Sequence, residues 1–193
     1  MTELCDIALK YRTDKCPAIR HSYTPFYDKL FSARRSTINK VLELGIGDER
    51  FRTKIGDNAQ LGASLKMWRD YFPNAQVYGV DIDPSSQFTD ERIQTFRADA
   101  TSVEDLTGLI KEIGDNIDLV VDDASHQTAD QILTCRLLMP MLRGGVTYVI
   151  EDARDPKRVM DGLKDYDCTL AELAPIKGNH RHWNNIITVY HKW

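Results

Sequence analysis

The sequence lacks the features that mark secreted, membrane-embedded and nucleic-acid-binding proteins. Its four cysteines are scattered and form no C-x-x-C pair, which argues against a disulfide framework or a zinc site. No apolar run approaches the length of a membrane span, and the N-terminal residues have neither a basic region nor an apolar core typical of a secretion signal. The formal net charge of -4 argues against binding to nucleic acid or to an anionic membrane. We therefore expect a cytoplasmic protein with free thiols and neither a nucleic-acid nor a membrane partner.

The order of apolar patterns along the chain predicts the fold. The 193 residues are enough for one domain, and β-branched runs alternate with segments of helical periodicity. Such alternation is typical of a parallel sheet with helices on both faces. We predict a single Rossmann-like α/β domain, with a mostly parallel seven-stranded sheet in residues 40–193 and a helical cap in residues 1–39. The predicted strands are Lys40–Leu44, Gln76–Ile82, Ile93–Ala98, Ile117–Asp122, Val146–Ile150, Asp167–Leu173 and Ile186–His191, and the predicted helices are Glu3–Tyr11, Pro25–Ala33, Ala63–Tyr71, Val103–Ile113, Asp130–Leu142 and Pro156–Lys164.

A glycine turn follows the first predicted strand, at Glu43–Gly47. In open α/β sheets ligands bind at this edge, and glycines there let a ligand approach the backbone closely. A dinucleotide-binding fingerprint would continue to a third glycine, but Arg50 occupies that position. The turn therefore indicates a nucleotide-containing ligand and disfavours an NAD-dependent oxidoreductase.

The next two predicted strands end in acidic residues, Asp81 and Asp99. An acid at the second strand end can accept hydrogen bonds from both hydroxyls of a ribose. An acid at the third strand end could receive the amino group of adenine. Either acid alone fits an ordinary loop residue, but three successive strand ends of these types favour an adenosyl ligand.

The fourth and fifth predicted strands each end in two adjacent carboxylates, Asp122-Asp123 and Glu151-Asp152, and His126 follows the first pair. Because neighbouring parallel strands lie side by side, the two pairs should converge at one edge. Carboxylates at such a short distance repel one another unless a cation neutralises them. A cluster rich in oxygen ligands suits Mg²⁺. A metal-bound hydroxyl would lose its proton more readily, and His126 could accept it. The alternatives are a helix N-cap, an ordinary turn and a surface histidine.

In combination, these segments resemble class I S-adenosylmethionine-dependent methyltransferases. The Glu43–Gly47 turn, the acidic end at Asp81 and the Asp99-Ala100 pair are similar to the first three motifs of that family. The resemblance implies that Asp81 holds the ribose and that Asp99 holds the adenine. It also implies that the backbone of the glycine turn lies beside the methionine moiety.

Further motifs resemble the metal-dependent sugar O-methyltransferases of macrolide biosynthesis, such as those acting on mycinamicin and tylosin precursors. Their D-D-x-S-H, G-G-x-Y-x-x-E-D and S-L-x-x-W-x-x-Y-F-P motifs correspond to Asp122–His126, Gly144–Asp152 and Ser64–Pro73, and their T-D-K and Y-T-x-x-Y motifs to residues 13–15 and 23–27. Gly144–Asp152 has one more residue before its tyrosine than the motif has. This resemblance implies Asp123, Glu151 and Asp152 as Mg²⁺ ligands, and His126 with Asp123 as the catalytic residues, His126 being the general base. The implied cofactor-binding residues are Lys15, Tyr27, Glu43, Gly45, Gly47, Gly62, Ser64, Asp81, Asp99, Ala100 and Asp122.

The acceptor is the least defined part of the prediction. Residues 48–59 differ from the glycine-rich loop of the macrolide enzymes, which also have extra N-terminal sequence. The tail Lys177–Asn185 is either an exposed hairpin turn or a lid whose Trp183 stacks on a sugar. We predict methyl transfer to a sugar hydroxyl of an antibiotic or related small glycoside. N-methylation of an aminosugar in an aminoglycoside is the main alternative, followed by a non-catalytic nucleotide-binding protein.

Two further points concern partners. A nucleic-acid amino-methyltransferase is disfavoured, because Asp122–Ser125 stands where such enzymes have [DN]-P-P-[YFW]. The oligomeric state, including a homodimer, stays open. The expected partner is thus a small-molecule glycoside acceptor.

Overall fold

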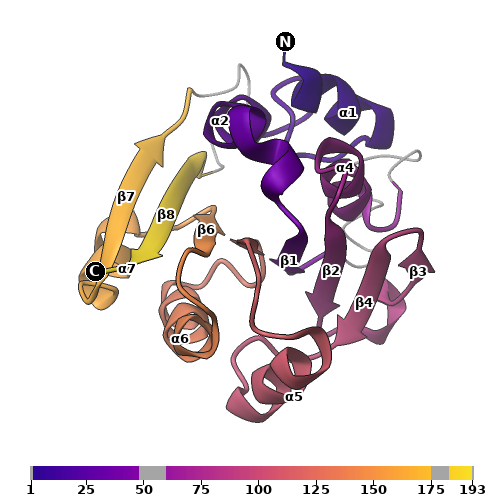
Figure 1. Cartoon of the computed structure of the whole chain (residues 1–193). Coiled ribbons are helices and arrows are strands. Elements are labelled where there is room, and N and C mark those ends of the chain that lie inside the picture. Colours follow the sequence, from indigo (N-terminus) through magenta and orange to yellow (C-terminus); the bar gives the residue numbers. More distant parts are fainter. Residues whose placement is uncertain (1, 48–59, 175–182, 193) are drawn as a thin grey trace.

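The computed structural model describes residues 2–47, 60–174 and 183–192, and within these ranges the chain forms one eight-stranded sheet between two layers of helices (Figure 1). Arg50, the stretch 48–59 and most of the tail 177–185 lie outside the described residues. Along the sheet the order is β3 (Thr89–Asp90), β4 (Ile93–Arg97), β2 (Gln76–Asp81), β1 (Lys40–Leu44), β5 (Leu119–Asp122), β6 (Thr147–Glu151), β8 (Asn185–His191) and β7 (Tyr166–Glu172).

The central strands are parallel and the outer ones are not. β4, β2, β1, β5 and β6 run in one direction, whereas β8 is antiparallel to β6 and β7, and β3 is antiparallel to β4. The strand order reverses at β1, which has β2 on one side and β5 on the other. Such a reversal opens a crevice at the carboxyl ends of the strands, which is where ligands bind in this class of sheet.

Helices cover both faces of the sheet, as its alternating side chains require. Val41 and Val121 pack toward the layer of α1 (Glu3–Tyr11), α2 (Tyr23–Phe31) and α4 (Ala63–Tyr71). Leu42 and Val120 pack toward the layer of α5 (Val103–Ile113), α6 (Thr128–Leu138) and α7 (Pro156–Gly162). Val41 and its neighbour Leu42 in β1 are both fully buried, as are Val120 and Val121 in β5. Burial on both faces explains why these strands are continuous apolar runs in the sequence. Short 3₁₀ helices are η1 (Ser32–Thr37), η2 (Pro84–Ser86) and η3 (Met139–Met141).

The predicted α/β architecture is confirmed, and the strand count is corrected from seven to eight. The extra strand, β3, has two exposed residues and is too short to produce an alternating pattern. Five helix ends also differ: both ends of α2, both ends of α6 and the C-terminal end of α7, and proline accounts for two of them. α2 begins at Tyr23, because Pro25 is acceptable in the first turn, where N–H groups have no helical partner. α6 ends at Leu138, since Pro140 lacks the N–H that would continue the helix.

The described helices also bear on membrane insertion. None of them combines the length and the apolar character that a bilayer-spanning helix needs.

Candidate active site

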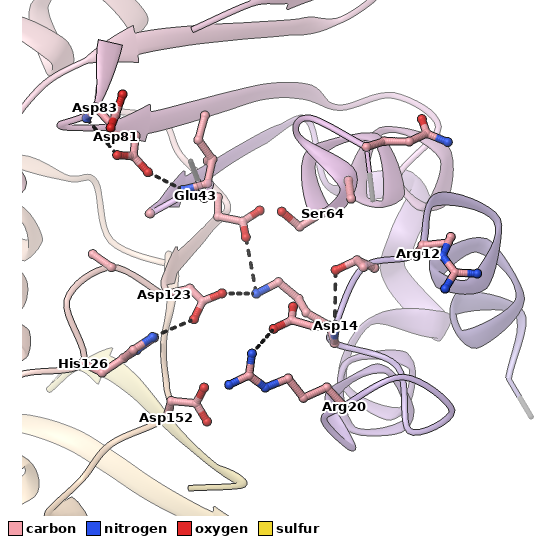
Figure 2. Close-up of a pocket in the computed structure, with 18 of the residues that line it drawn as sticks. Arg12, Asp14, Arg20, Glu43, Ser64, Asp81, Asp83, Asp123, His126 and Asp152 are labelled. Carbon is pink, nitrogen blue, oxygen red and sulfur yellow. Dashed lines mark hydrogen bonds and ion pairs between the residues drawn. The ribbon is translucent and has the colours of Figure 1, made fainter. Parts of the chain in front are cut away.

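A cavity of about 410 Å³ lies at the carboxyl ends of β1, β2 and β5, where the loop between α1 and α2 faces the sheet (Figure 2). Several charged residues line it without having been predicted, among them Arg12, Asp14, Arg20 and Asp83. The predicted site residues that line it are Lys15, Glu43, Gly45, Gly47, Ser64, Asp81, Asp123, His126 and Asp152.

The turn after β1 requires glycine at its first position. Gly45 has a φ of +81°, and a Cβ there would lie 2.4 Å from the carbonyl oxygen of Asp123. The Gly45 N–H donates to the carbonyl oxygen of Val80 at 2.8 Å, which fixes the turn against β2. The close approach that glycine allows is thus used by the chain's own backbone, and it brings the ends of β1 and β5 together beside the cavity.

Asp81 is held in place by backbone donors. Its Oδ2 accepts a hydrogen bond from the N–H of Ile46 at 3.1 Å, and its Oδ1 accepts one from the N–H of Asp83 at 2.9 Å. A carboxylate has about four acceptor positions, so each oxygen can still accept a hydroxyl donor from a ligand. Two amides of neighbouring turns therefore fix the orientation of this carboxylate, and its contact with a ribose stays a prediction.

Asp99 is less directly placed than the prediction implies. It follows β4, and its Oδ1 accepts hydrogen bonds from the N–H of Thr101 at 2.8 Å and from the Thr101 hydroxyl at 2.7 Å. These bonds lower the pKa of Asp99. The adenine contact of Asp99 stays a prediction. The predicted site residues that do not line the cavity are Tyr27, Gly62, Asp99, Ala100, Asp122 and Glu151.

Lys15, from the loop between α1 and α2, joins three carboxylates. Its side chain is 1% exposed, and its Nζ lies 2.5 Å from Glu151 Oε2, 2.7 Å from Asp123 Oδ2 and 3.3 Å from Glu43 Oε1. Burial alone would lower the pKa of this ammonium, but the three nearby carboxylates outweigh burial and raise it well above its usual range. Lys15 therefore stays charged and ties the helical cap to the ends of three strands.

The two glutamates around Lys15 are buried and have donors on both oxygens. Glu151 Oε1 accepts from the hydroxyl of Tyr27 at 2.6 Å, and Glu43 Oε2 accepts from the indole N–H of Trp68 at 2.8 Å. Burial raises the pKa of both carboxyls, and the Lys15 ammonium opposes that rise. Glu151, predicted as a metal ligand, thus has both oxygens engaged by Lys15 and Tyr27 in this structure. Its role at the metal stays a prediction.

Asp122, the first acid of the β5 pair, points away from the cavity. It is 1% exposed, and its Oδ2 accepts a hydrogen bond from the hydroxyl of Tyr148 at 2.9 Å. Burial raises the pKa of Asp122 to about 7, against the opposing effect of that hydrogen bond. The two neighbours of the Asp122-Asp123 pair therefore differ in environment, and only Asp123 lines the cavity.

Asp123, His126 and Asp152 form a group whose candidate ligand atoms all lie within 4.8 Å of one another (Figure 2). His126 Nε2 lies 3.9 Å from Asp123 Oδ1, and Asp152 Oδ1 accepts a hydrogen bond from the hydroxyl of Tyr23. His126 and Asp152 have φ values of +55° and +53°, in the left-handed region that such residues seldom adopt. Strained backbone of this kind concentrates at functional sites.

The histidine of this group lies in an environment that favours its neutral form. Burial lowers the pKa of His126, the Asp123 carboxylate opposes this, and the charges of Lys15 and Arg154 reinforce it. The imidazole is therefore neutral near pH 7 and can accept a proton. Its Nδ1 is buried and has no hydrogen-bond partner among the described residues.

The donor set of this group fits a divalent cation. Burial and the neighbouring Asp123 charge raise the pKa of Asp152 to about 7, and a cation between the two carboxylates would relieve both effects. Mg²⁺ takes one or two protein carboxylates and fills the rest of its shell with water or substrate oxygens. Asp123 and Asp152 fit that pattern.

Sequence reasoning missed the contribution of Tyr23. Its hydroxyl holds Asp152, as that of Tyr27 holds Glu151, so one face of α2 supports both acids at the end of β6. The signal was present in the four-residue spacing of the two tyrosines, which places them on the same side of a helix. Without the packing of α2 against the sheet, that spacing indicates only a buried aromatic stripe.

Comparison with known proteins identifies the family. Residues 44–153 match the model of the FtsJ-like methyltransferase family. Two curated relatives are a mycinamicin VI 2''-O-methyltransferase from Micromonospora griseorubida, 35% identical over 150 residues, and an 8-demethyl-8-alpha-L-rhamnosyl tetracenomycin-C 2'-O-methyltransferase from Streptomyces olivaceus, 37% identical over 149 residues. These matches cover 78% and 77% of this chain but only 36% and 37% of the relatives, so the chain spans little more than a third of their length.

A solved structure shares the architecture. It is the MycE methyltransferase from the mycinamycin biosynthetic pathway in complex with Mg, S-adenosylhomocysteine and mycinamycin VI. The TM-score is 0.75 at 27% identity, and the match covers 98% of this chain and 54% of the MycE chain.

Proposed function

Since the chain belongs to the FtsJ-like methyltransferase family, we propose that it transfers a methyl group from S-adenosylmethionine to a sugar hydroxyl of a small glycoside, with Mg²⁺ orienting the acceptor. One observation carries the proposal. The group of Asp123, His126 and Asp152 faces the same cavity as the Gly45 turn and Asp81. A methyl donor and a deprotonating site are thereby within reach of one acceptor.

The donor end of the cavity supports the choice of methyl donor. Asp81 presents a carboxylate preset by two backbone amides for the two hydroxyls of a ribose. Gly45 and Gly47 line the same end and leave the backbone accessible. The MycE structure contains S-adenosylhomocysteine, the product that S-adenosylmethionine leaves after transfer.

The other end supports the chemistry. When bound, Mg²⁺ would be held by Asp123 and Asp152 and would favour loss of the proton from an acceptor hydroxyl. His126 takes that proton on its imidazole. The hydroxyl oxygen forms a bond to the methyl carbon, the sulfur–methyl bond breaks, and its electron pair stays on sulfur. The charges therefore balance, with S-adenosylhomocysteine and a methyl ether as products.

The relatives support the acceptor class. They are named as O-methyltransferases of rhamnosyl tetracenomycin C compounds and of mycinamicin VI. No name among these relatives describes an amino group as the acceptor, so the aminosugar alternative has no comparable support. We propose a glycosylated polyketide as the acceptor of this chain.

The test separates binding from turnover in one variant. His126→Ala should bind S-adenosylhomocysteine as the wild type does, because His126 lies away from the Asp81 end. Methyl transfer by this variant to mycinamicin VI or to 8-demethyl-8-α-L-rhamnosyl-tetracenomycin C should fall by about 10²–10⁴-fold. His191→Ala, at the end of β8, is the matched control and should retain full activity. Calorimetry gives the binding, and mass spectrometry gives the methylated product. Full turnover by His126→Ala would contradict the proposal.

A further inference from the structure

One large apolar side chain near the catalytic group is left exposed. Trp183 is 40% exposed, whereas Trp68 is fully buried in the core. A single exposed hydrophobic residue is ordinary on a protein surface and indicates nothing alone. The surroundings of Trp183 make it different from the other large exposed side chains among the described residues, such as Leu133 on α6.

The backbone at Trp183 is anchored to the cap. The carbonyl oxygen of Trp183 accepts a hydrogen bond from the hydroxyl of Tyr23 at 3.3 Å. The side chain of the next residue, Asn184, accepts from the N–H of Ser22 at 3.0 Å and donates to the carbonyl oxygen of Ala174 at 2.6 Å. The backbone that carries the indole is therefore held in place, which lowers the entropy lost when a ligand packs on the side chain.

The same contacts place Trp183 beside the catalytic group. The hydroxyl of Tyr23 bonds both to the Trp183 carbonyl and to Asp152 Oδ1, so these two residues share one partner. The guanidinium of Arg154 lies 5.0 Å from the centre of the Trp183 ring. Arg154 also donates to Gln127 Oε1 at 3.2 Å, next to His126 along the chain. Trp183 and Arg154 thus do not line the cavity itself but adjoin its His126–Asp152 end through Tyr23 and Gln127.

We propose that Trp183 and Arg154 form the binding surface for the sugar ring of the acceptor, an inference that rests on the proposed function. The carbon–hydrogen face of a pyranose is apolar and packs against an aromatic face. A guanidinium offers five N–H donors to the hydroxyl oxygens of the same sugar. The indole supplies a large rigid contact area at a low cost in side-chain entropy. The pair would hold the sugar so that one hydroxyl reaches His126.

The position of the surface explains how it would act. Donor binding takes place at the Gly45–Asp81 end, so a change at Trp183 should alter acceptor affinity without altering cofactor affinity. The transferred proton goes to His126, whereas the contacts of Trp183 with the described residues are with Tyr23 and Arg154. The expected signature is therefore a change in the KM for the acceptor with little change in kcat.

The experiment compares three variants of the full chain with the wild type, using mycinamicin VI and 8-demethyl-8-α-L-rhamnosyl-tetracenomycin C as acceptors. Trp183→Ala should raise the acceptor KM by about tenfold or more, as loss of an aromatic contact at the centre of an interface does. Trp183→Phe should recover most of the affinity, because it restores a flat apolar surface. Leu133→Ala is the matched control, since Leu133 is 43% exposed on α6, and it should behave as the wild type.

The outcomes separate the binding surface from the proposed function. If the wild type is active and the acceptor KM of Trp183→Ala is unchanged, the proposed binding surface is overturned and the proposed function is not. A parallel fall in S-adenosylhomocysteine affinity and melting temperature, equal in the Ala and Phe variants, would overturn it in favour of a structural role. A wild type that binds S-adenosylhomocysteine but methylates neither glycoside would overturn the proposed acceptor class and the surface with it.

Discussion

The two ends of the cavity hold their acidic side chains by different means. At the donor end, Asp81 is fixed by two backbone N–H groups contributed by neighbouring turns. At the catalytic end, Asp123 and Glu151 depend on the ammonium of Lys15, and Asp152 depends on the hydroxyl of Tyr23. The first arrangement comes from the backbone of the sheet itself, and the second comes from side chains of the cap.

This difference has an energetic consequence. Backbone amides are dipoles that stabilise one carboxylate without a counter-charge. A cluster of buried carboxylates needs a cation, because repulsion and desolvation both oppose its ionisation. We infer that the donor end can form without metal, whereas the catalytic end combines a built-in cation, Lys15, with a site for an exchangeable one.

The largest effect on stability is expected from removing the ammonium of Lys15. Lys15→Met should lower the free energy of unfolding by about 3–5 kcal/mol, because it leaves buried carboxylates without their partner. Urea denaturation followed by circular dichroism measures this loss. Lys10→Met is the control, since Lys10 forms a solvent-exposed ion pair with Asp70 that water screens, and its loss should leave the stability almost unchanged.

A second substitution sharpens that result. Adding Glu151→Gln to Lys15→Met removes one of the uncompensated charges and should recover part of the lost stability. If Lys15→Met costs no more than Lys10→Met, the ammonium does not hold the cluster together.

The next effect concerns pH and has opposite signs at two strand ends. The pKa of Asp122 is raised to about 7 in the folded protein, so as pH rises from about 4 to 7 the unfolded state releases a proton that the folded state retains. Folding is thereby destabilised, by up to about 4 kcal/mol at 1.36 kcal/mol per pKa unit. Asp122→Asn should therefore gain stability over the wild type between pH 5 and pH 8, measured in EDTA by urea denaturation.

Asp99 supplies the matched opposite case. Its pKa is lowered by hydrogen bonds from Thr101, so the stability it contributes is present above the unfolded pKa and is lost as pH falls through the folded one. Asp99→Asn should be less stable than the wild type at pH 7, and the difference should shrink as the pH falls through the lowered pKa that Asp99 has in the folded protein. A gain in stability for both variants at pH 7 would contradict the assigned environments.

A smaller effect is expected at Asp81. Asp81→Asn should weaken S-adenosylhomocysteine binding by about tenfold or more, which corresponds to about 1.4 kcal/mol for charged hydrogen bonds to the ribose. Because the side chain is partly exposed and its partners are backbone amides, the stability should fall by only about 1 kcal/mol. Titration calorimetry measures the affinity of the variant and of the wild type for S-adenosylhomocysteine. An unchanged affinity would contradict the assignment of Asp81 to the donor site.

Most of the donor end could be predicted from the sequence because its determinants are local. The glycine turn and the acid at Asp81 lie at strand ends that hydrophobic patterning locates, and the parallel order places them at one edge. The Asp123–His126 segment could be located for the same reason, and so could Asp152 at the end of β6.

The rest could not be predicted because it depends on long-range packing. Lys15 meets Glu151 across 136 positions of sequence, and the hydroxyl of Tyr23 meets Asp152 across 129. No local pattern encodes which acid a cap residue reaches, so the sequence could not predict that Lys15 and Tyr27 both contact Glu151. The metal role of Glu151 and the cofactor roles of Lys15 and Tyr27 stay predictions. The two-residue strand β3 was missed for the opposite reason, since it is too short to carry any periodicity.

The comparison of the two ends is tested most directly by removing the metal. Wild-type protein is titrated with S-adenosylhomocysteine, and methyl transfer to mycinamicin VI is measured in parallel, each with Mg²⁺ and with excess EDTA. We predict that the affinity for S-adenosylhomocysteine changes less than about twofold, while methyl transfer falls by about 100-fold or more and returns when Mg²⁺ is restored. Methyl transfer that persists in EDTA would contradict the assignment of Asp123 and Asp152 to a catalytic metal site.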